Sequence, residues 1–158
     1  MTFSEYIEDL CRRHRLVKHS DDEVHFSDLA DDAQNKYAHS MNYPCVVLDE
    51  GDFDIRGAEG QPEMVDVCSV LFLTHVRDSA DADEVKGAFA LTRRICLDFL
   101  KKFVRDRKAG TRPLTRFKAV GSQGTRIYLQ DAGLYGYILM FEHPEIFTDK
   151  DCDNSFEE

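Results

Sequence analysis

The stretch "LYGYILMFEH", residues 134–143, is the most strand-like run in the sequence, and it decides the fold class. Successive side chains of a strand point to opposite faces, so the run is read with a period of two. Both faces are then apolar, which indicates a strand that is covered on both sides. One face carries Tyr135, Tyr137, Leu139 and Phe141, and the other carries Leu134, Gly136, Ile138 and Met140.

Four further segments are typical of strands. The run "MVDVCSVLFLTHV" (64–76) is apolar on both faces, which predicts a central position in the sheet. The segments 115–121 and 125–130 read as two more strands, and "QDAG" (130–133) predicts the hairpin turn that leads into the last strand. The remaining strand is "YPCVVLDEGDFDI" (43–55), which fades into the acidic residues Asp49, Glu50, Asp52 and Asp54.

Two long segments have the periodicity of amphipathic helices. In residues 2–17, apolar residues recur at spacings of three and four, with acids near the start and bases near the end, as the helix dipole favours. Residues 83–108 carry one broad apolar stripe, and Gly110 and Pro113 follow as stop signals. A second short helix is expected within residues 28–41.

The order helix, strands, helix, strands predicts a two-layer α+β domain. We expect a twisted, mostly antiparallel sheet of about four to six strands, with an N-terminal helix and one long central helix. Residues 1–147 form this single domain, and the acidic tail 148–158 is expected to be disordered. The helix at 83–108 covers the tyrosine face of the last strand while the N-terminal helix covers Ile138 and Met140, or else one of the two faces meets another subunit.

Charge is divided unevenly along the chain. The net charge is -10, yet residues 84–126 contain twelve Lys/Arg and three Asp/Glu, a net charge of +9, which leaves -19 for the remainder. Such a molecule can attract copies of itself or hold a polyanion on one face. The alternative is that these segments mix in space and the field averages out.

The composition also indicates where the protein resides. No apolar run approaches the roughly 20 residues that a membrane helix needs, so no membrane contact is expected. The N-terminus lacks a basic region followed by an apolar one, so no signal peptide is expected. The five cysteines are odd in number and none lies in a CxxC spacing, which indicates a reduced environment without disulfides.

No residue pattern indicates catalysis. His14, His19 and His25 do not have the spacing of metal ligands, so we expect solvated loop histidines. The acids of residues 49–54 lack the glycine and glutamate positions of an EF-hand loop, so they are expected to keep a strand edge soluble, with divalent-ion binding as the alternative. Cys68 and His75 lie on opposite faces of one predicted strand. The sequence therefore predicts a non-enzymatic protein with no metal site, cofactor or small-molecule substrate.

The segment "VGSQGTRI" (120–127) resembles the G-x-x-G loop of a KH domain, whose glycines let the chain approach a nucleic-acid backbone closely. It also lies in the basic segment 84–126. A KH loop joins two helices, however, whereas the flanks here read as strands, so a glycine-rich hairpin turn is the alternative. A nucleic-acid-binding module is thus the second functional hypothesis, and its candidate residues are Gly121, Ser122, Gln123, Gly124 and Arg126.

The element order over residues 1–145 resembles that of tail terminator and tail-completion proteins of bacteriophages and related contractile machines. The corresponding segments are the N-terminal helix, "YPCVVLD", "VDVCSVLFLTHV", the long helix "VKGAFALTRRICLDFLKKFVRD" and the final strands. The chain also resembles small proteins of prophage-like structural clusters of Bacteroidetes in "MTFSEYIEDLCRRH", "YPCVVLDEGDFDI" and "LYGYILMFEH". The likeness rests on topology and general pattern, and no invariant motif carries it.

This resemblance implies a homo-oligomeric ring, often hexameric, that caps the tail tube or joins the tail to the head. The expected partners are copies of the chain and tail tube or neck proteins, in the virion or in the host cytoplasm during assembly. The divided charge suits head-to-tail contacts between copies. The residues expected at these contacts are Arg93, Arg94, Lys101, Lys102 and Arg105 on the helix, Asp49, Glu50, Asp52 and Asp54 on the strand, and Tyr135 and Tyr137.

Overall fold

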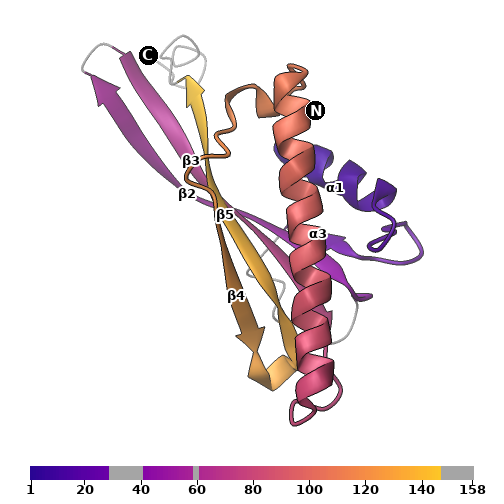
Figure 1. Ribbon diagram of the computed structural model, residues 1–158. Helices are drawn as coiled ribbons and strands as arrows, with labels where there is room; N and C mark the ends of the chain where they lie inside the picture. Colours follow the sequence, from indigo (N-terminus) through magenta and orange to yellow (C-terminus); the bar gives the residue numbers. More distant parts are fainter. Residues whose placement is uncertain (29–40, 59–60, 147–158) are drawn as a thin grey trace, which may run out of the picture.

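A computed structural model describes residues 1–28, 41–58 and 61–146. The strands span Phe26–Ser27 (β1), Cys45–Ala58 (β2), Gln61–His75 (β3), Gln123–Leu129 (β4) and Leu134–Ile146 (β5). Within the described ranges they form one five-stranded sheet in the order β1-β2-β3-β5-β4 (Figure 1). β1 pairs parallel with β2, and every other pair is antiparallel. The predicted α+β class and mostly antiparallel sheet are confirmed.

Strand β2 pairs with β3 from one end of β2 to the other. The register runs from Cys45 opposite Leu73 to Ala58 opposite Gln61, with a bulge at Glu50–Asp52. β3 lies between β2 and β5, which confirms its predicted central position. A β-bulge increases the local twist, and beyond it the two strands diverge from both helices (Figure 1).

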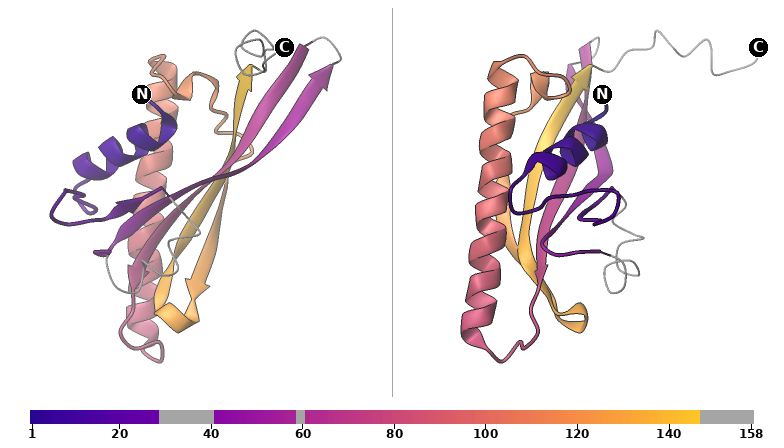
Figure 2. Two further views of the ribbon diagram at one scale, coloured as in Figure 1. Left: turned by 180° about the vertical axis from the view of Figure 1, so that it is seen from behind. Right: turned by 90° about the vertical axis from the view of Figure 1, so that its right-hand side faces the viewer.

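Helix α1 (Phe3–Arg13) and helix α3 (Ala82–Lys108) form the helical layer (Figure 2). Thr2 begins α1 with a capping box, because its hydroxyl accepts from the Glu5 backbone N–H while the Glu5 carboxylate accepts from the Thr2 backbone N–H. The Asp81 carboxylate caps α3 by accepting from two backbone N–H groups of its first turn. The central helix spans the predicted residues, whereas the N-terminal helix ends sooner than the pattern over 2–17 predicts.

Both helices pack on the same face of the sheet. Phe3 of α1 meets Phe103 of α3 and Phe141 of β5 edge-on, with ring centroids 6.0 and 5.6 Å apart. The expectation that the N-terminal helix covers Ile138 and Met140 is therefore wrong. The apolar stripe of α1 finds more aromatic surface beside α3 than on the opposite face, and edge-to-face aromatic pairs stabilise that arrangement.

The tyrosine face of β5 lies beneath α3, as predicted. The Phe89 ring meets Tyr135 and Tyr137 edge-on, with centroids 5.7 and 6.2 Å away. The opposite face of the sheet carries a separate, smaller cluster of buried residues. Its members are Met41, Cys45, Val47, Leu73 and Leu134.

The strand predicted at 115–121 does not form. Residues Leu114–Arg116 make a 3-10 turn (η1), and residues 117–122 follow without strand pairing. The reason is tertiary, because Leu114 and Phe117 are fully buried and anchor this segment in the core beside α3. The predicted turn at "QDAG" is confirmed, since a 3-10 turn over Gln130–Ala132 (η2) and Gly133, at a φ of 62°, join β4 to β5.

Two predicted segments cannot be compared with the structure. The short helix expected within 28–41 falls on residues of which 29–40 lie outside the described ranges, and the acidic tail 148–158 lies wholly outside them. Among the helices of the described ranges, none combines the length and the apolar character that crossing a bilayer requires.

Candidate functional site: a projecting arm and a groove between the helices

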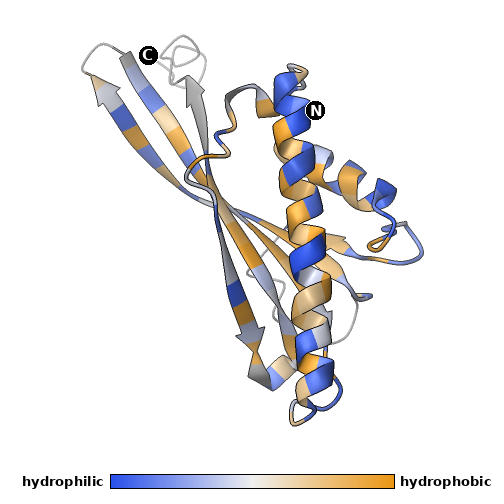
Figure 3. Ribbon diagram, in the orientation of Figure 1, coloured by the Kyte–Doolittle hydropathy of each residue, from blue (hydrophilic) through white to orange (hydrophobic). Residues whose placement is uncertain are grey.

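The outer part of the β2–β3 pair stands clear of the helical layer, and we call it the arm. It comprises residues 51–58 of β2 and 61–66 of β3. Every residue of 51–58 is exposed, whereas Val46–Leu48 at the other end of β2 are fully buried. Neither helix extends over the arm in Figure 1, and Figure 3 shows hydrophilic and hydrophobic bands along its strands.

One face of the arm presents apolar side chains to solvent. Phe53 is 64% exposed and Ile55 is 50% exposed. Ile55 is paired opposite Met64, and Phe53 is paired opposite Asp66, so the register brings these four side chains to the same face. Two large apolar side chains are thus exposed side by side on this face of the arm.

The arm is also strongly acidic. Residues 49–66 contain seven acids and one base, a net charge of -6. The base is Arg56, whose guanidinium pairs with Asp54 at 2.8 Å and with Glu142 of β5 at 2.7 Å. These hydrogen bonds raise the pKa of Arg56, Asp54 contributing most. The arm is thereby joined to β5 by charge as well as by strand pairing.

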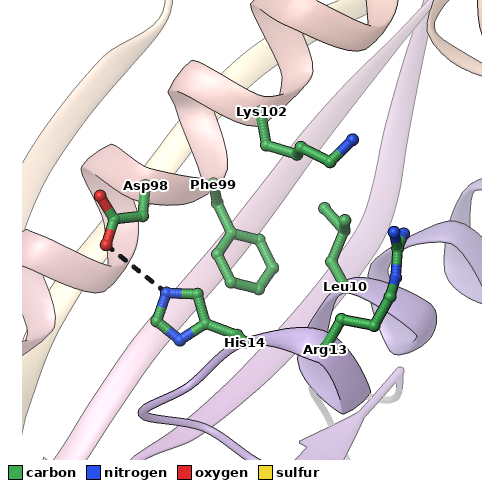
Figure 4. Close-up of a pocket in the computed structure, with 6 residues that line it drawn as sticks. All are labelled: Leu10, Arg13, His14, Asp98, Phe99 and Lys102. Atoms are coloured by element: carbon green, nitrogen blue, oxygen red, sulfur yellow. Dashed lines mark ion pairs between the residues drawn. The ribbon is translucent and has the colours of Figure 1, made fainter.

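A groove lies where α1 crosses α3 (Figure 4). Its volume is about 170 Å³. The apolar side chains in it are Leu10 and Phe99, both buried. Its rim is charged and comprises Arg13, His14, Asp98 and Lys102.

The His14 ring closes one side of the groove. Its Nε2 lies 3.6 Å from Oδ2 of Asp98, the contact drawn in Figure 4. Its Nδ1 accepts a hydrogen bond from the Leu16 backbone N–H at 3.2 Å. Burial lowers the pKa of His14, and the neighbouring Asp98 only partly opposes that effect. The neutral imidazole is therefore favoured, which leaves this side of the groove less polar.

A buried polar network holds the two helices at the groove. The Tyr6 hydroxyl donates to Oδ2 of Asp106 at 2.9 Å, and the Lys102 ammonium pairs with the same carboxylate. Burial opposes the charge of Asp106, but these hydrogen bonds outweigh it and hold the pKa of Asp106 below its usual value. Because Tyr6 belongs to α1 and Asp106 to α3, the network sets the spacing of the helices on either side of the groove.

The basic residues predicted for subunit contacts lie on α3. Within the sequence 93–108 there are seven bases and two acids, a net charge of +5. Lys102 is half-buried in the groove, and the other four candidates are exposed. The exposed four are Arg93, Arg94, Lys101 and Arg105.

The acidic candidates lie at the base of the arm and on it. Asp52 and Asp54 are exposed, Asp49 is half-buried, and the side chain of Glu50 lies outside the described part of the chain. Among the described side chains, no ion pair joins the arm to α3. The structure therefore does not bring the predicted acids and bases together within one chain.

The two tyrosine candidates contact residues of the same chain. Tyr135 is 8% exposed and stacks on Tyr128 of the neighbouring strand. The Tyr137 hydroxyl accepts from Nε of Arg126 at 3.2 Å. The polar partner that a partly buried tyrosine hydroxyl needs is therefore supplied to Tyr137 by strand β4 of the same chain.

The candidate nucleic-acid segment is neither a loop between helices nor a turn between two strands. Gly121 sits in a turn at a φ of 95°, and Ser122 leads into β4, to which Gln123 and Gly124 belong. The Arg126 guanidinium lies 5.0 Å from the centre of the Phe89 ring as well as beside Tyr137. Nucleic-acid contact by this segment stays a prediction.

The expectation of solvated histidines is wrong. The side chains of His14, His19 and His25 are 15%, 8% and 9% exposed, because residues 14–28 return along α1 and then pair with β2. His19 lies 3.4 Å from Glu8, and a ring nitrogen of His25 lies 2.8 Å from the Pro44 carbonyl oxygen. Across the described ranges, no three His, Cys, Asp or Glu residues are grouped as metal ligands would be.

Sequence reasoning missed the most exposed apolar side chains of the arm and the groove. A signal for Phe53 and Ile55 was present, because both alternate with acids in "DFDI" as residues of a two-faced ribbon do. The groove left no such signal, since Leu10 and Phe99 read only as members of helical core stripes.

No protein-family model, no curated protein and no solved structure matches this chain. The arm, the groove and the charges on them are therefore the basis on which a function can be assigned.

Proposed function

We propose that the chain is a structural, non-enzymatic subunit that assembles with copies of itself into a closed ring of the tail terminator type. Such a ring caps the tail tube or joins the tail to the head. The observation that carries the proposal is the arm, which continues past the helical layer while presenting Phe53 and Ile55 to solvent.

An uncovered apolar ribbon suits an assembly better than an isolated monomer. Burying one large apolar side chain stabilises a contact by roughly 1.5–3 kcal/mol, and the arm offers two that its own chain leaves in water. Exposed sheet edges invite pairing with other chains, and proteins limit wrong pairing with charged residues. The acids of the arm would limit wrong pairing in this way. They would still allow the arm to be attracted to a basic surface.

The charge division supports contacts of the head-to-tail kind. The arm and its base carry -6 and residues 93–108 of α3 carry +5. Contacts between two different patches of identical subunits close into rings when the rotation allows it, and form filaments when it does not. A ring that ends a tail tube is a structure of this geometry, and tail tube or neck proteins would be its further partners.

The test is the mass of the intact chain in solution. Size-exclusion chromatography with light scattering at low salt should show one discrete oligomer over a wide range of protein concentration. Its fraction should fall as salt is added, because charges that attract across an interface are screened. A protein that stays monomeric up to the highest soluble concentration at low salt would contradict the proposal, and so would unlimited growth without a closed species.

A further inference from the structure

We infer that the arm of one copy docks in the groove between α1 and α3 of the next copy, with the Phe53 ring entering the groove. This inference rests on the proposed function, because it names the two surfaces that a ring of this chain would join.

The groove matches the Phe53 ring in size. Phe53 is 64% exposed on a projecting ribbon, and the groove is a hollow of about 170 Å³ that contains Leu10 and Phe99. An apolar cavity of about 150 Å³ is large enough to hold a benzene molecule, so the groove can take a phenyl ring. Leu10 is 6% exposed and Phe99 is 2% exposed, so these two side chains form the floor on which the Phe53 ring would rest.

An acid of the arm would meet bases at the rim of the groove. Asp66 is paired opposite Phe53, so it would arrive at the rim of the groove together with the ring. The rim carries two bases, Arg13 and Lys102, and one acid, Asp98, and Arg94 is near enough to His14 to act on its pKa. Each rim cation in the groove already has a carboxylate on its own chain, so the arm would add a second acid and need not supply the first.

Charge disfavours symmetric contacts between two copies. Two arms placed against each other would oppose -3 to -3 over residues 51–58 and 61–66, and two copies of residues 93–108 of α3 would oppose +5 to +5. Only the unlike pair joins opposite charges, which favours the specific encounter and disfavours the wrong ones. Figures 1 and 2 both show the arm extending away from α1, so the contact is one between copies.

A cross-link between two differently marked chains tests the contact directly. One chain carries Ile55→Cys and the other carries Asp98→Cys, and both carry Cys152→Ser. The native thiols Cys11, Cys45, Cys68 and Cys96 are buried and do not compete. After mixing and mild oxidation, a disulfide-linked heterodimer is expected, because a disulfide forms only when the two Cα atoms come within roughly 7 Å. The matched control replaces Asp98→Cys with Asp131→Cys, an exposed site on η2 that should not cross-link.

A second pair of variants tests the anchor. Phe53→Ser should weaken self-association by at least about tenfold, as the loss of an aromatic anchor does. The control is Val120→Ser, which removes an apolar side chain that is 95% exposed but lies outside the arm. It should leave the assembly unchanged, and thermal melting should show both variants folded.

The outcomes separate the inference from the proposed function. If a discrete oligomer forms but neither the cross-link nor the effect of Phe53→Ser appears, the arm does not dock in the groove and the ring is closed by other surfaces. If the unmodified chain is monomeric, the ring itself is rejected and the inference falls with it. Equal cross-linking of Asp98→Cys and Asp131→Cys would also overturn the inference, because it would show that the arm meets the groove no more often than another exposed site.

Discussion

The inner and outer halves of the β2–β3 pair have the same kind of strand pairing. The inner half is buried beneath the helices, whereas the outer half is exposed to solvent. In the inner half, Val46 and Phe72 face each other across the strands, and both are fully buried beneath the helices. In the outer half, the strands pair residue for residue in the same way, yet Phe53 and Ile55 stand in water. The change follows the bulge at Glu50–Asp52.

This difference shows that strand pairing and burial are separate requirements. Backbone hydrogen bonds carry the pairing outward regardless of what lies above the sheet, but an isolated two-stranded ribbon is marginal in water. The arm is an extension of a covered sheet, and its pairing with β5 and the Arg56–Glu142 contact brace it. Phe53 and Ile55 therefore contribute little to the fold, and are free to serve a contact with another chain.

The largest expected effect comes from truncating the same residue type in the two halves. Phe72→Ala should lower the free energy of unfolding by about 3–5 kcal/mol, because it leaves a cavity beside Phe99, whose ring centre is 5.1 Å away. Phe53→Ala should change it by about 0.5 kcal/mol or less, since its ring is already in water. Urea unfolding of dilute protein at high salt measures both without contribution from assembly. Equal losses would mean that the arm is part of the core.

A smaller but still large effect is expected where β3 and β5 approach most closely. A Cβ added at Gly136 would lie 1.8 Å from the Phe72 carbonyl oxygen, so Gly136→Ala forces two central strands apart. We expect a loss of about 3 kcal/mol. Gly87→Ala is the matched control, because nothing lies within 4 Å of its added Cβ and alanine favours a helix by about 1 kcal/mol. Thermal melting should move in opposite directions for the two variants, and a stable Gly136→Ala protein would contradict this register.

The polar network beside the groove should have an intermediate effect. Asp106→Asn removes the charge that Lys102 and the Tyr6 hydroxyl meet in a buried place, so a loss of about 2 kcal/mol is expected. Asp98→Asn, at a side chain 39% exposed, should cost less than about 1 kcal/mol. Chemical unfolding compares them. If Asp98→Asn proved the more damaging, the spacing of the helices would not depend on Asp106.

The smallest effect is expected in the dependence of stability on pH. Burial holds the pKa of His14 in the folded protein below the 6.5 of an exposed histidine. As pH falls through 6.5, the unfolded chain takes up the proton first, so this group lowers stability progressively from there down to its folded pKa. His14→Asn keeps an acceptor near the Leu16 N–H and should remove this part of the slope. An unchanged profile between pH 7 and 5 would show that His14 titrates normally.

Much of the fold could be predicted from local pattern. The apolar periods of 64–76, 83–108 and 134–143 predicted the central strand, the long helix and the last strand, because helical and strand spacing are properties of short segments. The division of charge between "DEGDFD" and the α3 sequence was also plain in the sequence. The apolar periodicity and the division of charge are both properties of short segments. They can be read from the sequence because neither depends on distant parts of the chain.

The tertiary structure decided which apolar residues would be covered. Phe117 and Phe53 each sit in a segment that reads as a strand, yet packing beside Phe103 takes the first into the core while the second lies beyond the helices. The same holds for α1, which joins α3 on one face, and for the groove that forms only because Leu10 and Phe99 meet there. The burial of an apolar side chain depends on contacts between segments far apart in the chain. The periodicity within one segment therefore cannot predict it.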